Sequence, residues 1–531
     1  MRAAVDGGIG SQRCEAVADT VSALRSIHVR GRILARIRKV LGKTSHQPSR
    51  SLADNVHWNE LACLTRLSLV ASYLPRHLTQ GHIFVPESAH FVSLVAGTGQ
   101  LLVRTSVYGM LVNQLHSAYL ARSASGDANT TPEIQSLLDE FATARTLKVF
   151  GLMRPTPTSD YAVYDPPNDR QYLENLEKLS ILLSRVMEAL AGSQCKFPDV
   201  MLPLPKLICS AALLNMWRAR WMGLVASSAF QVSPAIQTRA FVTLSILATS
   251  DVDDDLLYQM LVALKSALLN YDDSDPTVMV SMLRCIHKIV VALPTTSRYI
   301  AQLFWLAVAL LQSGHIGLYA EAIHLLRASL ERMHEQDLFK KKGVAATLME
   351  SRESLDEIAS QLDHLLGVSF RSNFSLTLGH IIFKGIRHQM LKDSAEAALR
   401  SLLRITVKTC ADHHHENDGP GSPLCQDVIG YFIALLPLST TVDSFKALLG
   451  DASADRSWLS EEVLPAEDDD DPMSRIPFAL FGIQSNLGAL YAAAFVSTIL
   501  SSSQGDDTET EMLFNVVSDI ANSYPDTVST A

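Results

Sequence analysis

The feature that most constrains the fold is a repeated pair of helical segments in the middle of the chain. Helix starts marked by proline recur at Pro234 and Pro276, which are 42 residues apart, and each follows a residue that can cap a helix, Ser233 or Asp275. Proline suits the first turn of a helix, where its missing N–H costs no hydrogen bond. One helical hairpin cannot bury its own apolar face, so such hairpins stack on their neighbours.

Two helices in about 40 to 47 residues are typical of HEAT and armadillo repeats. We therefore predict an all-α fold, a HEAT/armadillo-like α-solenoid of stacked helical hairpins. The composition agrees, because 47% of the residues are apolar and only 7% are aromatic. Further segments with helical patterns are 58–74, 89–120, 132–149, 174–191, 255–270, 298–312, 373–387, 486–500, 509–523 and a segment that begins near His315. We interpret the GTGQ stretch at 97–100 as a turn in a helical hairpin, because it lacks the spacing and the lysine of a phosphate loop.

We predict four parts along the chain. Residues 1–50 form a basic N-terminal helical segment, and residues 51–440 form the helical-repeat solenoid. Residues 441–475 contain the acidic run EDDDD and are expected to be a disordered loop. Residues 476–531 carry two C-terminal helices, and a polar, glycine-rich loop is expected earlier, at 412–422.

A basic amphipathic helix is predicted from Arg30 to Lys43, in the sequence RGRILARIRKVLGK. Apolar residues fall at helical spacing between its charges. Two interpretations stay open: a solenoid helix with a solvated basic face, or a helix that lies on an anionic membrane. A second basic spot lies at the end of the segment GVSFRSNFSLTLGHIIFKGIRH. Ser372 can cap a helix there, and the helix dipole favours the cations in its last turn. Together the candidate contact residues are Arg30, Arg32, Arg36, Arg38, Lys39, Lys43, Lys384 and Arg387.

Several functional classes are disfavoured by the sequence. The formal net charge of −10 argues against nucleic acid as a partner. No serine-hydrolase elbow, zinc-protease helix or paired C-x-x-C is found, so we expect no catalytic activity, no cofactor and no metal. Three consecutive histidines at 413–415 do not provide the rigid frame that zinc requires.

The chain is expected to lie in the cytoplasm. Its seven cysteines are scattered and odd in number, which fits a reducing compartment. The uncharged stretch 476–505 is interrupted by proline and polar residues, so a buried helix is preferred over a membrane span.

The stretch at 367–388 also carries a family resemblance. It resembles a segment of neurofibromin with S-N-F, then G-H, then K-G-x-R-H, in that order. Further blocks with counterparts there are HWNELACLTRLSLVAS (57–72), LLVRTSVYGMLVNQLHS (101–117), AFQVSPAIQTRAFVTLSIL (229–247) and LFWLAVALLQ (303–312). The fungal Ira-type Ras regulators share this region, and the chain is more similar to them.

The resemblance implies a role beside a catalytic domain. Neurofibromin-type proteins are negative regulators of Ras whose GTPase-activating domain supplies an arginine finger. The similarity lies in the helical arm after that domain, and the chain lacks the F-L-R-x-x-x-P-A signature of the domain itself. We therefore expect a C-terminal piece of such a regulator, a scaffold arm that forms a homodimer and meets Ras only indirectly. The alternative is a free-standing adaptor for a protein partner or an anionic membrane, with peripheral membrane association.

Overall fold

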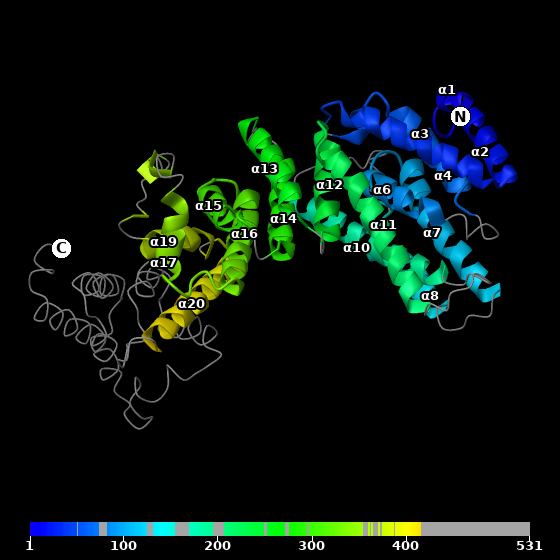
Figure 1. Cartoon of the computed structure of the whole chain (residues 1–531). Helices are drawn as coiled ribbons and strands as arrows, with labels where there is room; N and C mark the ends of the chain where they lie inside the picture. The colour runs from blue at the N-terminus through cyan, green and yellow to red at the C-terminus, as the bar shows by residue number, and fades with distance from the viewer. Residues whose placement is uncertain are drawn as a thin grey trace, which may run out of the picture. The chain divides into compact units, whose positions relative to one another are not determined.

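The structure is a computed structural model of the chain, and its regular elements are helical throughout the part that it describes (Figure 1). It describes residues 1–415 except 50, 74–81, 125–130, 154–168, 195–205, 249–251, 271–275, 295–296, 354–358, 362, 365–369, 372–373 and 387. The all-α prediction is confirmed for these residues. The acidic loop at 441–475 and the C-terminal helices predicted within 476–531 lie outside the described residues.

The chain divides into two compact units, Met1–Ala292 and Leu293–Ala531, and each is described by itself. The first unit contains α1 (Arg2–Gly7), α2 (Gln12–Leu24), α3 (Ile27–Ser45), η1 (Leu52–Asp54), α4 (Trp58–Val70), η3 (His82–Phe84), α6 (Val85–Val95), α7 (Leu101–Ala124), α8 (Thr131–Phe141), α9 (Ala144–Val149), α10 (Asp169–Gln194), α11 (Lys206–Ala229), α12 (Pro234–Leu247), α13 (Asp254–Leu269) and α14 (Thr277–Ala292). The second unit contains α15 (Ile300–Leu310), α16 (Ile316–Glu335), α17 (Val344–Arg352), α19 (Phe374–Ile386) and α20 (Lys392–His415).

The helix start at Pro234 is confirmed, but the predicted cap is wrong. Ser233 occupies the N-cap position without a side-chain hydrogen bond to the helix, because its Oγ lies 3.5 Å from Oγ of Ser49 instead. The backbone N–H groups of Val232 and Ser233 both donate to the carbonyl of Ser45, at 3.0 Å each. Ser45 ends α3, so the loop before α12 satisfies a carbonyl that the end of α3 leaves without a helical partner. The second predicted cap, Asp275, lies outside the described residues.

Several predicted element boundaries differ from the structure, and one is the predicted helix 132–149, which is divided into α8 and α9 at residues 142–143. The predicted helix 89–120 is divided into α6 and α7 by the turn at Gly97–Gln100, where Gly97 and Gly99 have φ of 75° and 70°. These left-handed angles suit glycine because it has no Cβ, and the turn predicted from GTGQ is confirmed. At the other end, α20 continues to His415, four residues into the loop predicted at 412–422. No glycine or proline occurs before Gly419 to stop that helix.

α12 is the central helix of the first unit. It packs against α6, α10, α11 and α14, and residues on all its sides are buried. Phe241 and Leu244 in its middle are fully buried. Its companion α14 packs beside it, and α13 packs on α14. The two helices whose starts were predicted from Pro234 and Pro276 therefore pack side by side.

The second unit is organised around α16, which packs against α15 and α20. Tyr319 on α16 donates its hydroxyl to the carbonyl of Ile381, at 2.9 Å, and accepts from the N–H of Gly385, at 3.0 Å. These bonds join α16 to α19, whose predicted inward face is confirmed by the burial of Phe374, Leu378, Ile381 and Ile382. The stretch at 367–388 therefore supplies a packed helix of this unit.

An aromatic cluster lies at the start of α19 in this unit. Trp305 on α15 meets Phe370 edge to face, with ring centroids 5.2 Å apart, and donates its Nε1–H to the carbonyl of Leu348, at 3.0 Å. The buried guanidinium of Arg352 lies 4.6 Å from the Trp305 ring centroid and forms two hydrogen bonds with Asp363, at 2.5 and 2.7 Å. The two buried charges of Arg352 and Asp363 therefore pair with each other, which offsets the cost of removing them from water.

Within the described residues, the structure places no helix of sufficient length and hydrophobicity to cross a bilayer.

We predict that Gly385→Ala destabilises the second unit by about 1–3 kcal/mol. A Cβ at this position would lie 2.6 Å from both Cε1 and the hydroxyl oxygen of Tyr319, so α16 and α19 would have to separate. Hydrogen exchange of α16 and α19 measures the change locally. The control is Gly42→Ala on α3, where a Cβ meets no atom within 4 Å and the substitution should favour the helix. Unchanged protection of both helices in Gly385→Ala would contradict the close approach.

We also predict that His90 makes the chain less stable in acid. His90 on α6 is buried, with Nε2 3.3 Å from Oγ of Ser228, and burial lowers its pKa to about 4, with Arg38 acting in the same direction. The unfolded chain, with an ordinary histidine pKa of about 6.5, binds a proton that the folded chain does not accept between these values. The contribution of His90 is therefore complete above pH 6.5 and is lost as the pH falls towards 4, by about 3 kcal/mol at most.

Calorimetry of His90→Gln across this pH range measures the effect. The slope of stability against pH should fall, because the position no longer titrates. His116→Gln, at an exposed site on α7, is the matched control and should keep the slope of the unchanged chain. An identical slope in His90→Gln would show that burial of this imidazole does not control the acid response.

Candidate functional site

The predicted basic residues of the N-terminal helix lie on α3, and the structure separates them by burial. Ile33, Ile37 and Val40 on the apolar face are buried, as the pattern predicts. Arg30 is also buried, with its guanidinium 5.9 Å from the ring centroid of Phe84. Burial lowers the pKa of Arg30 to about 10. Arg30 therefore contributes to packing and provides no exposed charge.

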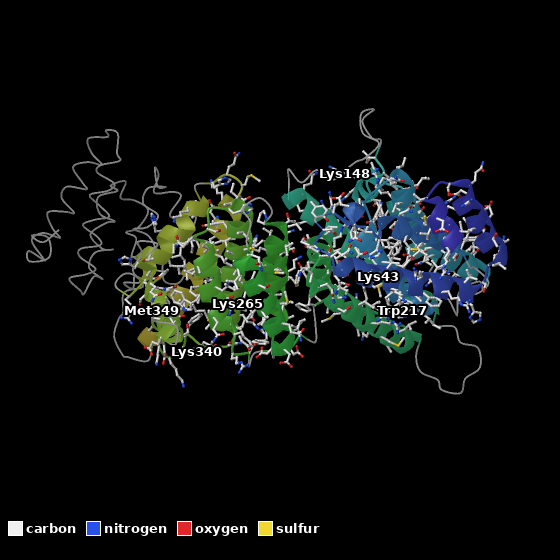
Figure 2. The ribbon with its side chains drawn as sticks, turned by 90° about the horizontal axis from the view of Figure 1, so that it is seen from above. Lys43, Lys148, Trp217, Lys265, Lys340 and Met349 are labelled. Carbon is white, nitrogen blue, oxygen red and sulfur yellow. The ribbon has the colours of Figure 1, made fainter. Side chains whose placement is uncertain are left out.

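A stripe of basic side chains remains on the outer side of α3. Arg32, Arg36, Lys39 and Lys43 follow one another at three- and four-residue spacing, which places them on one side of a helix. Arg36 is paired with Glu60 of α4, with Nε 2.5 Å from Oε1. Arg32, Lys39 and Lys43 are exposed, and Figure 2 labels Lys43.

The remaining predicted residues are placed differently. Arg38 is exposed but lies off this stripe, and its charge acts on His90. Lys384 belongs to the second unit, near the end of α19, where its Nζ donates to Oε1 of Gln312 at 3.1 Å. Arg387 lies outside the described residues. The basic contact patch thus stays a prediction. Its exposed candidates on the α3 stripe are Arg32, Lys39 and Lys43.

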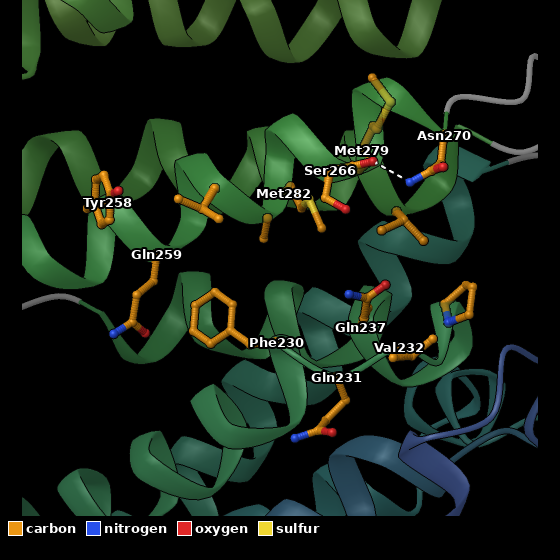
Figure 3. Close-up of a pocket in the computed structure, with 15 residues that line it drawn as sticks. Phe230, Gln231, Val232, Gln237, Tyr258, Gln259, Ser266, Asn270, Met279 and Met282 are labelled. Carbon is orange, nitrogen blue, oxygen red and sulfur yellow. Dashed lines mark hydrogen bonds between the residues drawn. The ribbon is translucent and has the colours of Figure 1, made fainter.

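A surface groove in the first unit was missed by the sequence analysis. It lies between α13 and the turn that joins α11 to α12, with α14 as its floor (Figure 3). Its volume is about 790 Å³. We call it the α13 groove, and it is lined by Phe230, Gln231, Val232, Pro234, Gln237, Tyr258, Gln259, Val262, Ala263, Ser266, Ala267, Asn270, Val278, Met279 and Met282.

The walls of the α13 groove are held by contacts behind them. Phe230 packs edge to face on Phe241 of α12, with ring centroids 6.0 Å apart. Val232 is tied through its backbone N–H to the end of α3, and the side-chain amide of Gln237 donates to the carbonyl of Ala229 at 3.4 Å. On the opposite wall, the side-chain amide of Asn270 donates to the carbonyl of Ser266 at 2.8 Å (Figure 3). The groove is therefore preformed rather than a gap between loose loops.

The lining of the α13 groove is mostly apolar, with uncharged polar side chains among it, and carries no charged residue. Three of its large side chains remain open to solvent: Val232 is 58% exposed, Tyr258 is 56% exposed and Val262 is 51% exposed. The sequence did contain a signal for this, since α13 has apolar residues around most of its circumference but buries only Leu257, Met260 and Leu264. When a helix has more apolar residues than its single buried face contains, a second contact is expected to cover the others.

Among the described residues, two kinds of reactive site were considered, a metal-binding cluster and a nucleophilic cysteine. No cluster of three or more histidine, cysteine, aspartate and glutamate side chains there could hold a metal ion. Cys14, Cys63 and Cys285 are buried, and burial raises the pKa of each thiol, so these cysteines are poor nucleophiles.

Comparison with known proteins identifies relatives for most of the chain. No protein-family model matches it. It is 22% identical over 437 residues to the inhibitory regulator protein IRA2 of Saccharomyces cerevisiae, which covers 81% of the chain and 13% of IRA2. It is 23% identical over 371 residues to the inhibitory regulator protein IRA1 of the same yeast, which covers 68% of the chain and 11% of IRA1. The resemblance predicted from the sequence is confirmed: the chain is homologous to a limited region of these Ira-type inhibitory regulators.

Proposed function

We propose that the chain is a non-catalytic scaffold arm of an Ira-type negative regulator of Ras signalling. In this role it supports a GTPase-activating domain that lies outside the 531 residues. The observation that carries the proposal is the match to yeast inhibitory regulators across 81% of the chain but only 13% of the length of IRA2. The described surfaces suit this role, since they offer contact areas rather than reactive groups.

The proposed architecture of the arm is a HEAT/armadillo-like stack of helical hairpins. It is supported by the packing of α12 beside α14, whose starts at Pro234 and Thr277 are 43 residues apart. That spacing falls within the length of one such repeat. A stack of this kind acts through geometry, because it holds attached domains and partners at set positions. We further propose that it joins two copies of the regulator in a homodimer.

A second candidate function is a free-standing adaptor that binds an anionic membrane peripherally. The observation that favours it is the exposed stripe of Arg32, Lys39 and Lys43 on α3. Each basic residue near an anionic bilayer contributes about 1 kcal/mol of attraction, so three of them give weak and salt-sensitive binding. In this function the same helix contacts lipid headgroups and not protein.

We predict that the purified chain leaves the rate of GTP hydrolysis by Ras within about twofold of its intrinsic value. An arginine finger accelerates the reaction by about 10³–10⁵, and we assign that residue to the separate domain. Single-turnover hydrolysis with equimolar chain measures the rate, and a catalytic GTPase-activating domain serves as the positive control. Acceleration that one arginine substitution abolishes would contradict the non-catalytic role.

Flotation with phosphatidylserine vesicles and sedimentation velocity distinguish the two candidates. The scaffold arm should stay in the soluble fraction and sediment as a dimer at micromolar concentration. The adaptor should float with anionic vesicles and stay in the soluble fraction when the vesicles are neutral. The double variant Lys39→Glu/Lys43→Glu should no longer float with anionic vesicles. Arg2→Glu/Arg13→Glu, at exposed sites on α1 and α2, is the charge-matched control. Flotation of the unchanged chain, or a monomer at every concentration, would overturn the scaffold arm as proposed.

A further inference from the structure

We propose that the α13 groove docks one amphipathic helix of a partner protein, with an apolar buried face and basic residues at one end. This inference is independent of the proposed function and rests on the groove itself. Its open apolar residues, its uncharged lining and the acidic residues beyond its end each constrain what can occupy it.

The dimensions of the groove fit a helix. One wall is formed by α13 from Tyr258 to Asn270, and Figure 3 shows these two residues at its opposite ends. At a rise of 1.5 Å per residue this wall is about 18 Å long, which corresponds to about three helical turns. The volume of about 790 Å³ accommodates several large side chains from one face of such a helix.

The lining determines the buried face of the partner. Tyr258, Val262 and Phe230 form apolar walls, and Met279 and Met282 form a floor of flexible thioether side chains that adapts to different apolar shapes. Ala263 and Ala267 lie between the large residues of α13 and let a partner backbone approach closely. A charged side chain that entered the groove would lose water and meet no opposite charge in the lining, so uncharged residues are favoured there.

The charges at one end of the groove determine which end group of the partner fits there. Asp253, Asp254 and Asp255 begin α13, one turn before Tyr258. Lys265 is the single basic residue on α13 and does not line the groove. The end of the groove at Tyr258 is therefore acidic, which attracts a basic end of a partner helix and repels an acidic one.

The same acidic surroundings argue against other occupants. An anionic membrane would be repelled by Asp253–Asp255, and a helix with acidic ends would meet like charge. The groove thus selects its partner by two separable properties, an apolar stripe and terminal positive charge.

The experiment selects helical peptides of about 18 residues, displayed on phage, against the purified 531-residue chain. One library has two fixed lysines at each end, the other has two fixed glutamates, and apolar positions on one face are varied in both. Selected peptides are then synthesised, and their affinities are measured by fluorescence anisotropy. Val262→Glu introduces a charge into the groove at a half-exposed site, so the fold should persist. Val291→Glu, on α14 at a site 66% exposed and outside the lining, is the matched control.

We expect enrichment from the lysine-ended library, with binding weakened about tenfold or more by Val262→Glu and unchanged by Val291→Glu. Asp255→Lys should weaken lysine-ended peptides about threefold and strengthen their glutamate-ended counterparts. The proposal is overturned if neither library is enriched above the Val262→Glu chain. It is also overturned if glutamate-ended peptides bind as tightly as lysine-ended ones, or if both valine variants lose binding equally.

Discussion

The burial of α12 among four neighbouring helices is the packing interaction on which the first unit depends. α12 contacts α6, α10, α11 and α14, which come from positions spread between Val85 and Ala292. No hairpin could enclose a helix that is apolar on all sides, so these segments are stable only together. α13 packs on α14 and buries one side only, which leaves the α13 groove open. The groove is thus a consequence of how the central helix is covered.

Buried arginines complete the hydrogen bonding where helices end. Arg239 on α12 donates to the carbonyl of Ala96, at 2.9 Å, and Arg104 on α7 donates to the carbonyl of Gly151, at 2.6 Å. Arg332 on α16, which is partly buried, also donates to a backbone carbonyl, that of Leu293 in the second unit. Carbonyls at the C-terminal ends of helices have no helical partner and attract positive charge. These three arginines therefore bind the ends of helices, and their positive charge is not available to a partner.

The parts of the fold that could be predicted are those with local causes. Pro234 begins a helix because its φ suits the first turn, and glycines at 97 and 99 break the chain because they adopt left-handed angles. The helix α11 was not predicted, although its 24 residues are largely apolar, because an all-round apolar pattern gives no single face to recognise. The cap expected from Ser233 failed because its hydroxyl meets Ser49, a residue 184 positions away.

The sequence by itself determined that α3 is a basic amphipathic helix, because charge and apolar spacing are local properties of a helix. It also indicated the relationship to Ira-type regulators. Only the tertiary structure decided that Arg30 packs beneath Phe84, that Arg36 pairs with Glu60, and that Lys39 and Lys43 stay exposed. The α13 groove was likewise beyond the sequence, since its walls come from three helices and a turn. Which side of a helix stays uncovered depends on neighbours distant in the chain, and spacing along one helix does not encode them.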